Sequence, residues 1–306
     1  MIRSVDLWDL PMPLGLRHRR EMVGVRTKSE HRVVQGRNTD HRPVRTWDWR
    51  RDGINEPEHL RFEELYRVTA GCMPVDLWLP RRNALVWTDD MLRGSAGRSA
   101  HYGWDVGVEA DTALTASGVA SPLTGSALRM KTAVGATASG EIHQEVGRTP
   151  RREAVLTLSV YLANDDSKDF RMEIYDDAGT SVYGDFLWSA GALASVSGSD
   201  ASAAVSVKVH SGTWYRAVLT VTLAATTALF PARTLGVRFY ATPGATANDG
   251  HHLYGPQLVL GSLPLEYMQI GGDRVSPVPV TMEDARFDLH GGVHRSVGCR
   301  LVEVIE

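Results

Sequence analysis

The sequence lacks most features that mark disulfide-rich, metal-binding and membrane proteins. Only two of its 306 residues are cysteines, Cys72 and Cys299, and their separation suggests two buried free thiols rather than a disulfide framework or a metal knuckle. Its apolar runs end within about ten residues, well short of the roughly 20 that span a bilayer, and the first residues contain no apolar signal core. We therefore expect a chain that folds in a cytoplasm without a membrane segment.

Catalytic and cofactor signatures are also missing. There is no Gly-X-Ser-X-Gly elbow, Walker-type loop, His-Glu-X-X-His helix or dinucleotide fingerprint. Adjacent carboxylates such as Asp165 and Asp166 stand in a turn-like context that does not suit glycoside hydrolysis. His251 and His252 lack a third spaced ligand and are expected in a polar turn before the final strand. A calcium ion on Asp165, Asp166 or Asp169 is an alternative, although no defined calcium loop matches. We predict no enzyme, no metal and no cofactor.

Charge is distributed unevenly along a chain whose net charge is only -3. Residues 17–51 contain eleven Lys or Arg against four acids. Arginine is favoured at interfaces and suits carboxylate partners, so the preferred interpretation is that this stretch contacts neighbouring copies in an assembly. A solvated loop and a nucleic-acid contact are the alternatives. No nucleic-acid-binding module accompanies the charge, which makes the last of these the least favoured.

The first 88 residues predict a small sheet carrying one helix. Strand-like segments lie at 22–25, 32–34, 43–49 and 73–80. Between them, Asn55 and Glu58 have the spacing of a reciprocal N-terminal cap, and Gly71 is a suitable end. The apolar stripe of this helix comprises Phe62, Leu65, Tyr66 and Thr69. The stripe predicts that the helix packs on the sheet.

Residues 89–273 differ in character, being rich in Ala, Ser, Thr and Gly. Strands separated by polar turns are expected at 155–162, 170–175, 205–209, 214–223, 235–240 and 253–261. This succession of short strands and polar turns predicts a β-sandwich or jelly roll. The Ala/Ser-rich piece 189–204 has little bulk and is expected to form a long exposed loop.

The end of the chain, 274–306, returns to strands after an expected linker at 275–280. Strands at 286–289 and 297–305 flank a hairpin turn at 290–293. About 30 residues cannot bury a core alone, so we expect this hairpin to pair with the N-terminal sheet. The predicted fold class is mainly β: a discontinuous β-sandwich with one α-helix (1–88 and 274–306) and an inserted β-sandwich or jelly roll (89–273).

Several segments support a resemblance to a known family. Arg45-Thr-Trp-Asp-Trp49, Ala70-Gly-Cys-Met-Pro74, Leu77-Trp-Leu-Pro80 and Asn83-Ala-Leu85 resemble the opening domain of distal tail and minor tail proteins of long-tailed phages. The segment 253–261, followed by 264–270, resembles the last strand of a virion-type jelly roll. The chain differs from compact distal tail proteins in its long basic stretch and its Ala/Ser-rich inserted domain.

That resemblance implies a tail-tube-like domain that forms a ring at the tail tip, commonly of six copies, and contacts the tail tube and hub proteins. The implied core or interface residues of this domain are Trp47, Trp49, Phe62, Leu65, Tyr66 and Trp78. The inserted sandwich would be carbohydrate-binding-module-like. Its position within a virion tail stays open.

Sugar binding by the inserted domain would need aromatic side chains beside polar groups. The candidates are Trp188, Tyr183, Tyr161, Trp104 and Tyr102. Each has an alternative role in core or inter-subunit packing, because large aromatics are usually buried and are favoured at interfaces. Trp188 is preferred because it stands beside the expected 189–204 loop rather than within a regular strand.

The expected function is therefore that of a structural component of a phage tail or tail tip, located in the virion and possessing no catalytic activity. A host cell-surface glycan is an expected partner of the inserted domain. The alternatives are a carbohydrate-binding adhesin or tail-fibre module, working without a ring, and a capsid decoration or head-fibre protein.

Overall fold

The computed structural model describes most of the inserted region and the strands of both chain ends. The described residues are 17–21, 24–28, 34–38, 44–54, 56, 59–60, 63, 66, 75–77, 82–86, 88, 91, 104–107, 112–123, 125–133, 138–148, 154–165, 169–177, 179–189, 192–199, 203–223, 234–241, 250–264, 266–267, 278–290 and 294–303. In the strands before residue 78 the description covers the backbone alone. No helix within these ranges is long and apolar enough to cross a membrane.

The chain divides into two compact units. Unit 1 comprises Met1–Leu77 and Val278–Glu306, and unit 2 comprises Trp78–Pro277. Strands dominate both units and every pairing is antiparallel, so the expected mainly-β class is confirmed.

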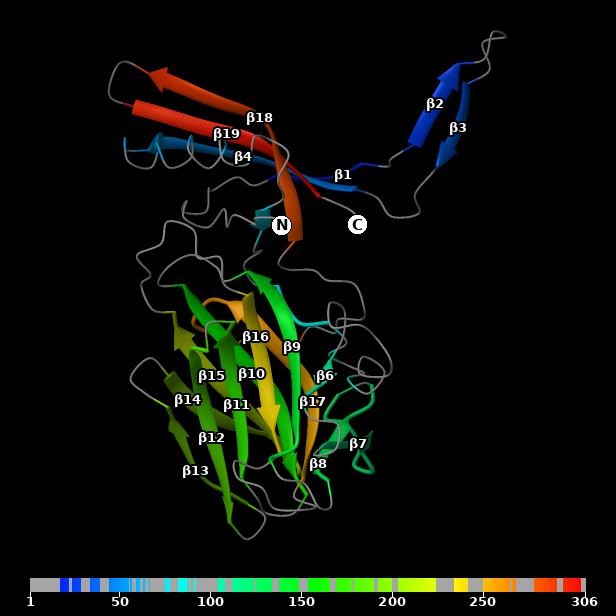
Figure 1. The fold of residues 1–306 in the computed structure, drawn as a ribbon, viewed down its shortest axis with the longest axis vertical. Helices are drawn as coiled ribbons and strands as arrows, with labels where there is room; N and C mark the ends of the chain where they lie inside the picture. Colours follow the sequence, from blue (N-terminus) through cyan, green and yellow to red (C-terminus); the bar gives the residue numbers. More distant parts are fainter. Residues whose placement is uncertain are drawn as a thin grey trace. The chain divides into compact units, whose positions relative to one another are not determined.

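Unit 1 is built on a five-stranded sheet to which both ends of the chain contribute. Its order is β1 (Arg17–Glu21), β4 (Val44–Ile54), β19 (His294–Glu303), β18 (Val278–His290) and β5 (Val75–Leu77), and a separate pair joins β2 (Gly24–Lys28) to β3 (Val34–Asn38) (Figure 1). The C-terminal hairpin thus pairs with N-terminal strands on both sides. The expected linker at 275–280 is wrong in its second half, because Val278 begins β18 and Val280 is buried opposite Val75.

The helix of unit 1 packs against β18. Glu56, His59, Leu60, Glu63 and Tyr66 are helical, which confirms a helix in this region. His59 and Tyr66 make edge contacts with Phe287, at ring-centroid distances of 5.7 and 6.1 Å. The expected cap residues Asn55 and Glu58 lie outside the described residues.

Unit 2 is a sandwich of two six-stranded sheets. Sheet I has the order β14 (Ala203–Ser211), β15 (Trp214–Thr222), β10 (Val155–Asn164), β17 (Gly250–Leu260), β8 (Leu128–Thr132) and β7 (Thr112–Ala116). Sheet II has the order β13 (Ala192–Gly198), β12 (Ser181–Ser189), β11 (Phe170–Asp176), β16 (Thr234–Tyr240), β9 (Glu141–Arg148) and β6 (Asp105–Val106). The six strands expected between 155 and 261 are all present.

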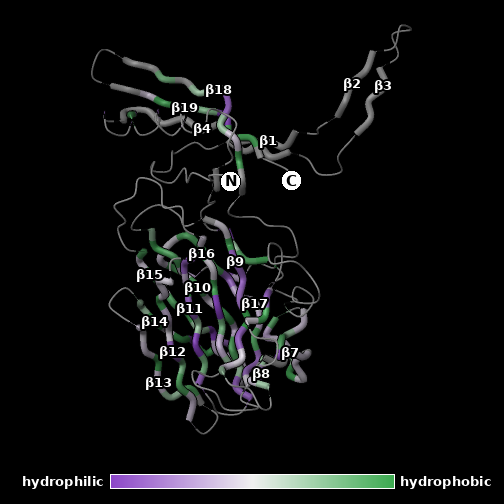
Figure 2. Tube along the Cα trace, in the orientation of Figure 1, coloured by the Kyte–Doolittle hydropathy of each residue, from purple (hydrophilic) through white to green (hydrophobic). Residues whose placement is uncertain are grey.

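The main core fills the space between the two sheets. Alternate residues of sheet II point inward, among them Phe170, Phe186 and Phe239, and each of these is fully buried. The rings of Phe170 and Phe239 stack with centroids 5.9 Å apart. Burying one such side chain contributes about 1.5–3 kcal/mol, so this layer holds the sheets together. Along β11 and β16 hydrophilic residues interrupt the hydrophobic ones, as a half-buried strand requires (Figure 2).

A second, smaller core covers the outer face of sheet I. Its buried members are Ala127, Tyr161, Ala163, Trp214 and Tyr254, with Tyr267 packed against them. The Trp214 indole N–H donates to the carbonyl of Ala120 at 2.9 Å, which fixes a loop over this face. Strand β10 is therefore buried on both faces: apolar residues face the main core, and Thr157 and Ser159 are buried with Tyr161 and Ala163 on the other face.

Two sequence-based expectations about unit 2 are wrong. The Ala/Ser-rich piece 189–204 is not a long loop, because Ala192–Gly198 forms β13 and pairs with β12. Backbone hydrogen bonds to β12 form this edge strand although Leu193 and Val196 are its only larger side chains. His251 and His252 do not form a polar turn either; both lie inside β17 and are buried, at 0% and 5% exposure.

Candidate functional site: the outer face of sheet II

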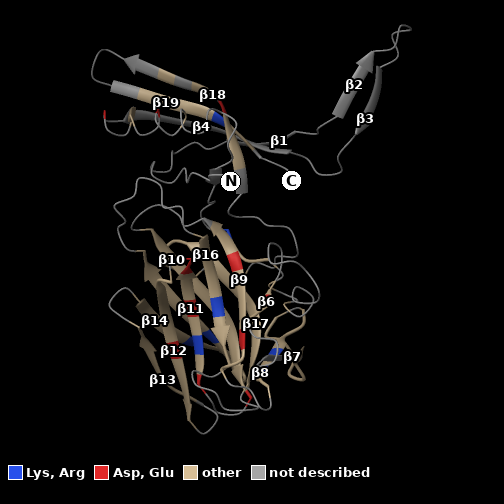
Figure 3. Ribbon diagram, viewed as in Figure 1, with Lys and Arg blue, Asp and Glu red and all other residues tan. Residues whose placement is uncertain are grey.

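The outer face of sheet II gathers charged and aromatic side chains from four neighbouring strands. On β11 the core side chains alternate with Arg171, Glu173 and Tyr175, which consequently share the opposite face. Strand pairing places Tyr183 opposite Glu173, and Arg238 opposite Glu173 on the other side. Figure 3 shows Lys/Arg and Asp/Glu positions on β9, β16, β11 and β12 of this sheet. We call this set of side chains the charged face.

Arg171 organises one end of the charged face. Its Nε and Nη2 donate to the two carboxylate oxygens of Asp185 at 2.7 and 3.0 Å, a bidentate geometry. The guanidinium also lies over the Tyr183 ring, 3.7 Å from the centroid. The hydrogen bond to Asp185 raises the pKa of Arg171 above its ordinary value. These contacts hold Tyr183 and Asp185 in fixed positions.

Arg238 organises the other end. Its guanidinium lies 4.3 Å from the centroid of the Tyr175 ring and donates to the Tyr240 hydroxyl at 2.9 Å. The Tyr240 hydroxyl donates to Glu173 at 3.0 Å, and Glu141 pairs with Arg238 Nε at 3.2 Å. Burial raises the pKa values of Tyr175 and Tyr240 to about 12. Both phenols therefore stay neutral hydrogen-bonding groups at physiological pH.

The charged face offers fixed hydrogen-bonding groups next to aromatic surface. Ring surfaces and convergent polar groups are what proteins use to orient a polar ligand. Because the guanidinium and carboxylate groups already hold one another, little side-chain entropy is lost when a ligand binds. The arrangement suits recognition of a saccharide or of a polar protein surface.

The predicted sugar-binding residues differ in how much of each side chain is exposed to solvent. Tyr183 is half-buried and lies on the charged face. Trp104, Tyr161 and Trp188 are only 1%, 5% and 7% exposed, which leaves them almost no surface for a ligand and matches the packing alternative. Tyr102 lies outside the described residues.

Specific contacts explain the burial of these three side chains. The Trp104 indole N–H donates to the Val86 carbonyl at 3.0 Å. Tyr161 belongs to the smaller core over sheet I. Trp188 lies within β12, contrary to its expected place beside a loop, and packs edge-on against Tyr215 at 5.3 Å.

Of the residues expected in a ring domain, only some can be placed. Trp47 and Trp49 lie in β4, where their backbones oppose Leu301 and Cys299 of β19. Tyr66 packs against Phe287. Phe62, Leu65 and Trp78 lie outside the described residues.

Sequence reasoning missed Tyr175, Arg238, Tyr240 and Glu173 as members of one face. The signal was present in the segment Phe170–Tyr175, where Arg171, Glu173 and Tyr175 alternate with apolar residues. Which other strands complete the face depends on sheet order, and that is not visible in the segment itself.

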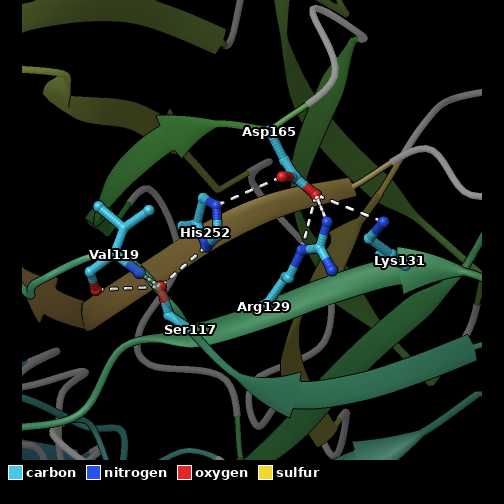
Figure 4. A network of polar contacts seen from close by, with 6 residues as sticks. All are labelled: Ser117, Val119, Arg129, Lys131, Asp165 and His252. Carbon is cyan, nitrogen blue, oxygen red and sulfur yellow. Dashed lines mark hydrogen bonds and ion pairs between the residues drawn. The ribbon is translucent and has the colours of Figure 1, made fainter.

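A second polar cluster lies on the opposite sheet and has a structural role (Figure 4). Asp165 accepts a hydrogen bond from Arg129 Nε at 2.7 Å, and Lys131 and His252 lie 3.6 Å from it. Ser117 contacts His252 Nδ1 at 2.9 Å. These contacts tie β7 and β8 to β10 and β17.

Two of the residues considered for a calcium ion, Asp165 and Asp169, have other partners. Arg129 and Lys131 already neutralise Asp165, and the Asp169 carboxylate accepts from the Trp188 backbone N–H at 3.4 Å. Within the described ranges, no group of three His, Cys, Asp or Glu side chains is placed to hold an ion. Asp166 lies outside those ranges.

Comparison with known proteins gives similarity of fold only. No family model and no curated protein matches the sequence significantly. Among solved structures, this chain is similar to the enzymatically active domain of bacteriophage CBA120 tailspike protein 4, with 9% identity over 58% of this chain and 21% of that one, at a TM-score of 0.36.

Two further neighbours have the same kind of likeness. The C-terminal family 22 carbohydrate-binding module of Clostridium thermocellum Xyn10B is 15% identical over 61% of this chain and all of its own, at a TM-score of 0.35. The Stig cyclase Fisc from Fischerella sp. TAU is 12% identical over 62% of this chain and all of its own, at 0.36. Since these neighbours differ in function and the scores are low, the likeness carries no argument about what this protein does.

Proposed function

We propose that the chain is a structural component of a phage tail or tail tip that has no catalytic activity. In this proposal unit 1 joins copies into a ring of six in the virion, and contacts the tail tube and hub proteins. Unit 2 supplies a sandwich for host-surface attachment. The basic stretch 17–51 contacts carboxylates of neighbouring copies in the ring.

The observation that carries the proposal is how unit 2 joins unit 1. Leu77 and Val278, the residues on either side of unit 2, are directly opposed in the β5–β18 pair. The whole sandwich is therefore inserted between two paired positions of one sheet. Such an insertion leaves the strand pairing of unit 1 intact. Unit 1 can therefore serve for assembly while unit 2 serves for attachment.

The mass of the full-length protein in solution tests the ring. We expect a mass of six copies by light scattering at low salt, closed rings by negative-stain imaging, and partial dissociation at high salt if residues 17–51 form ionic contacts. A monomer or trimer at both salt concentrations would overturn the ring. Binding to empty phage heads instead of tails would favour a decoration protein.

A second candidate function is carbohydrate binding without a ring, and the charged face favours it. Tyr183 is held by Arg171 next to Asp185, so a ring surface and hydrogen-bonding groups lie together on the sandwich. Under this candidate, Tyr183→Ala should weaken binding to a host cell-wall glycan about tenfold, the equivalent of about 1.4 kcal/mol.

Thr115→Ala is the control for that measurement, because Thr115 is exposed on β7 of sheet I, away from the charged face. Calorimetry with purified glycan fragments gives the affinities, and thermal melting checks that both variants are folded. Equal affinity of Tyr183→Ala and the parent protein would remove Tyr183 from any sugar site.

A further inference from the structure

Strand β14 forms an open edge of sheet I. Within the described part of the chain it pairs with β15 alone, and it is the terminal strand in the sheet order (Figure 1). Its nine residues, Ala-Ala-Val-Ser-Val-Lys-Val-His-Ser, contain no proline and a single lysine. A long edge strand with few charges presents unpaired backbone groups to another strand.

The edge also exposes apolar side chains. Val205 is half-buried and lies against Gly184 of β12, where an added Cβ would come within 3.0 Å of the valine. Val207 and Val209 follow on the same face but are 36% and 63% exposed. Val207 and Val209 are thus neighbours on one face of the edge strand, and burying them against another protein surface would be favourable.

We propose that β14 pairs with β14 of a second copy, antiparallel and centred on Val207. In this register Val207 faces its own counterpart, and Val205 of one copy faces Val209 of the other. All the valines then lie on one side of a continuous twelve-stranded sheet. A two-fold axis through the centre makes the interface identical for both copies.

Charge selects this register over its neighbour. Centring the pair on Lys208 would place two ammonium groups directly opposite each other, which destabilises an antiparallel pair. Centred on Val207, each Lys208 faces Ser206 of the other copy instead. The single charge on the edge thus acts against one register and leaves the proposed one open.

Disulfide crosslinking tests the register in the full-length protein. Directly opposed residues of antiparallel strands have Cα atoms about 4.5–5.5 Å apart, within the range of a disulfide. Val207→Cys should therefore give mainly covalent dimers under mild oxidation on a non-reducing gel. Ser206→Cys should give few, because the two cysteines would lie diagonally, about 7–8 Å apart.

Two further samples complete the experiment. The parent protein, with its native Cys72 and Cys299, gives the background level of crosslinking. The double variant Val205→Cys/Val209→Cys should crosslink, while Val209→Cys alone should stay at background. Equal crosslinking of Val207→Cys and Ser206→Cys, dimers at background level for Val207→Cys, or crosslinks to a different polypeptide would each overturn the proposal. None of these outcomes depends on whether unit 1 forms a ring.

Discussion

His251 is a buried neutral histidine at the centre of unit 2. It has no exposed surface, its Nε2–H donates to the Asp169 carbonyl at 2.9 Å, and its ring lies against Phe170. Burial lowers its pKa from 6.5 to about 4. The folded state therefore takes up this proton only at a much lower pH than the unfolded state does.

The shift of His251 predicts a loss of stability in mild acid. Between pH 6.5 and 4 the unfolded chain binds a proton at this site that the folded chain does not, so the free energy of unfolding falls as the pH falls. At 1.36 kcal/mol per pKa unit, the loss between pH 7 and pH 4.5 should be about 2.5 kcal/mol. Urea unfolding at pH 7 and pH 4.5 measures it.

Two variants isolate the contribution of His251 from that of other groups. His251→Gln keeps a side-chain donor for the Asp169 carbonyl and should show a smaller drop in stability between the two pH values. Ser197→Ala, at an exposed position without an ionisable group, should behave as the parent protein does. An unchanged pH dependence in His251→Gln would contradict the prediction.

The Cys299 thiol is expected to be unreactive toward thiol reagents in the folded protein. It is buried in β19 at 6% exposure and is a free cysteine, and burial raises its pKa to about 12. Because the thiolate is the reactive form, labelling by a thiol reagent at pH 8 should become rapid only in denaturant. A Cys72→Ser background restricts the measurement to this thiol, and fast labelling of the native protein would contradict the burial.

At the scale of elements, sheet II depends on a close approach between β11 and β16. The Tyr175 ring lies directly against Gly236, where an added Cβ would come within 2.4 Å of Cζ. Gly236→Ala should displace this ring from Arg238 and destabilise unit 2 by about 1–3 kcal/mol, the usual cost of overpacking.

Thermal unfolding measures this effect, and Gly118→Ala is the matched control. No atom lies within 4 Å of the Cβ position at Gly118, so the control should change stability by less than 0.5 kcal/mol in either direction, roughly. Equal melting temperatures for Gly236→Ala and the parent would mean that Tyr175 moves away at no cost.

For the whole molecule, the opposed positions of Leu77 and Val278 predict that the two units separate cleanly. Replacing residues 78–277 by Asn-Gly would convert β5 and β18 into a two-residue hairpin, a connection that suits directly opposed antiparallel strands. We expect the shortened unit 1 and an isolated 78–277 fragment each to unfold cooperatively, as circular dichroism can follow. An unfolded fragment 78–277 would contradict the division into units.

The sequence by itself determined the kind and position of most elements. Strands at 155–162, 170–175 and 235–240 were predictable from alternating or continuous apolar residues, and the helix around Glu56–Tyr66 from its cap and stripe. The turn before β19 was equally visible, since β18 ends at His290 and β19 begins at His294. These features depend on interactions between residues close in the chain.

Only the tertiary structure decided which residues share a surface. Arg171 of β11 meets Tyr183 of β12, and Arg238 of β16 meets Tyr175 of β11, because sheet order brings these three strands together. The sequence left Trp188 and Tyr161 with two possible roles, sugar contact or packing, and both side chains are buried by residues distant in sequence. Strand β13 forms because β12 provides backbone partners for an Ala/Ser-rich segment. Burial and strand pairing arise from contacts between distant segments, and no local pattern specifies those contacts.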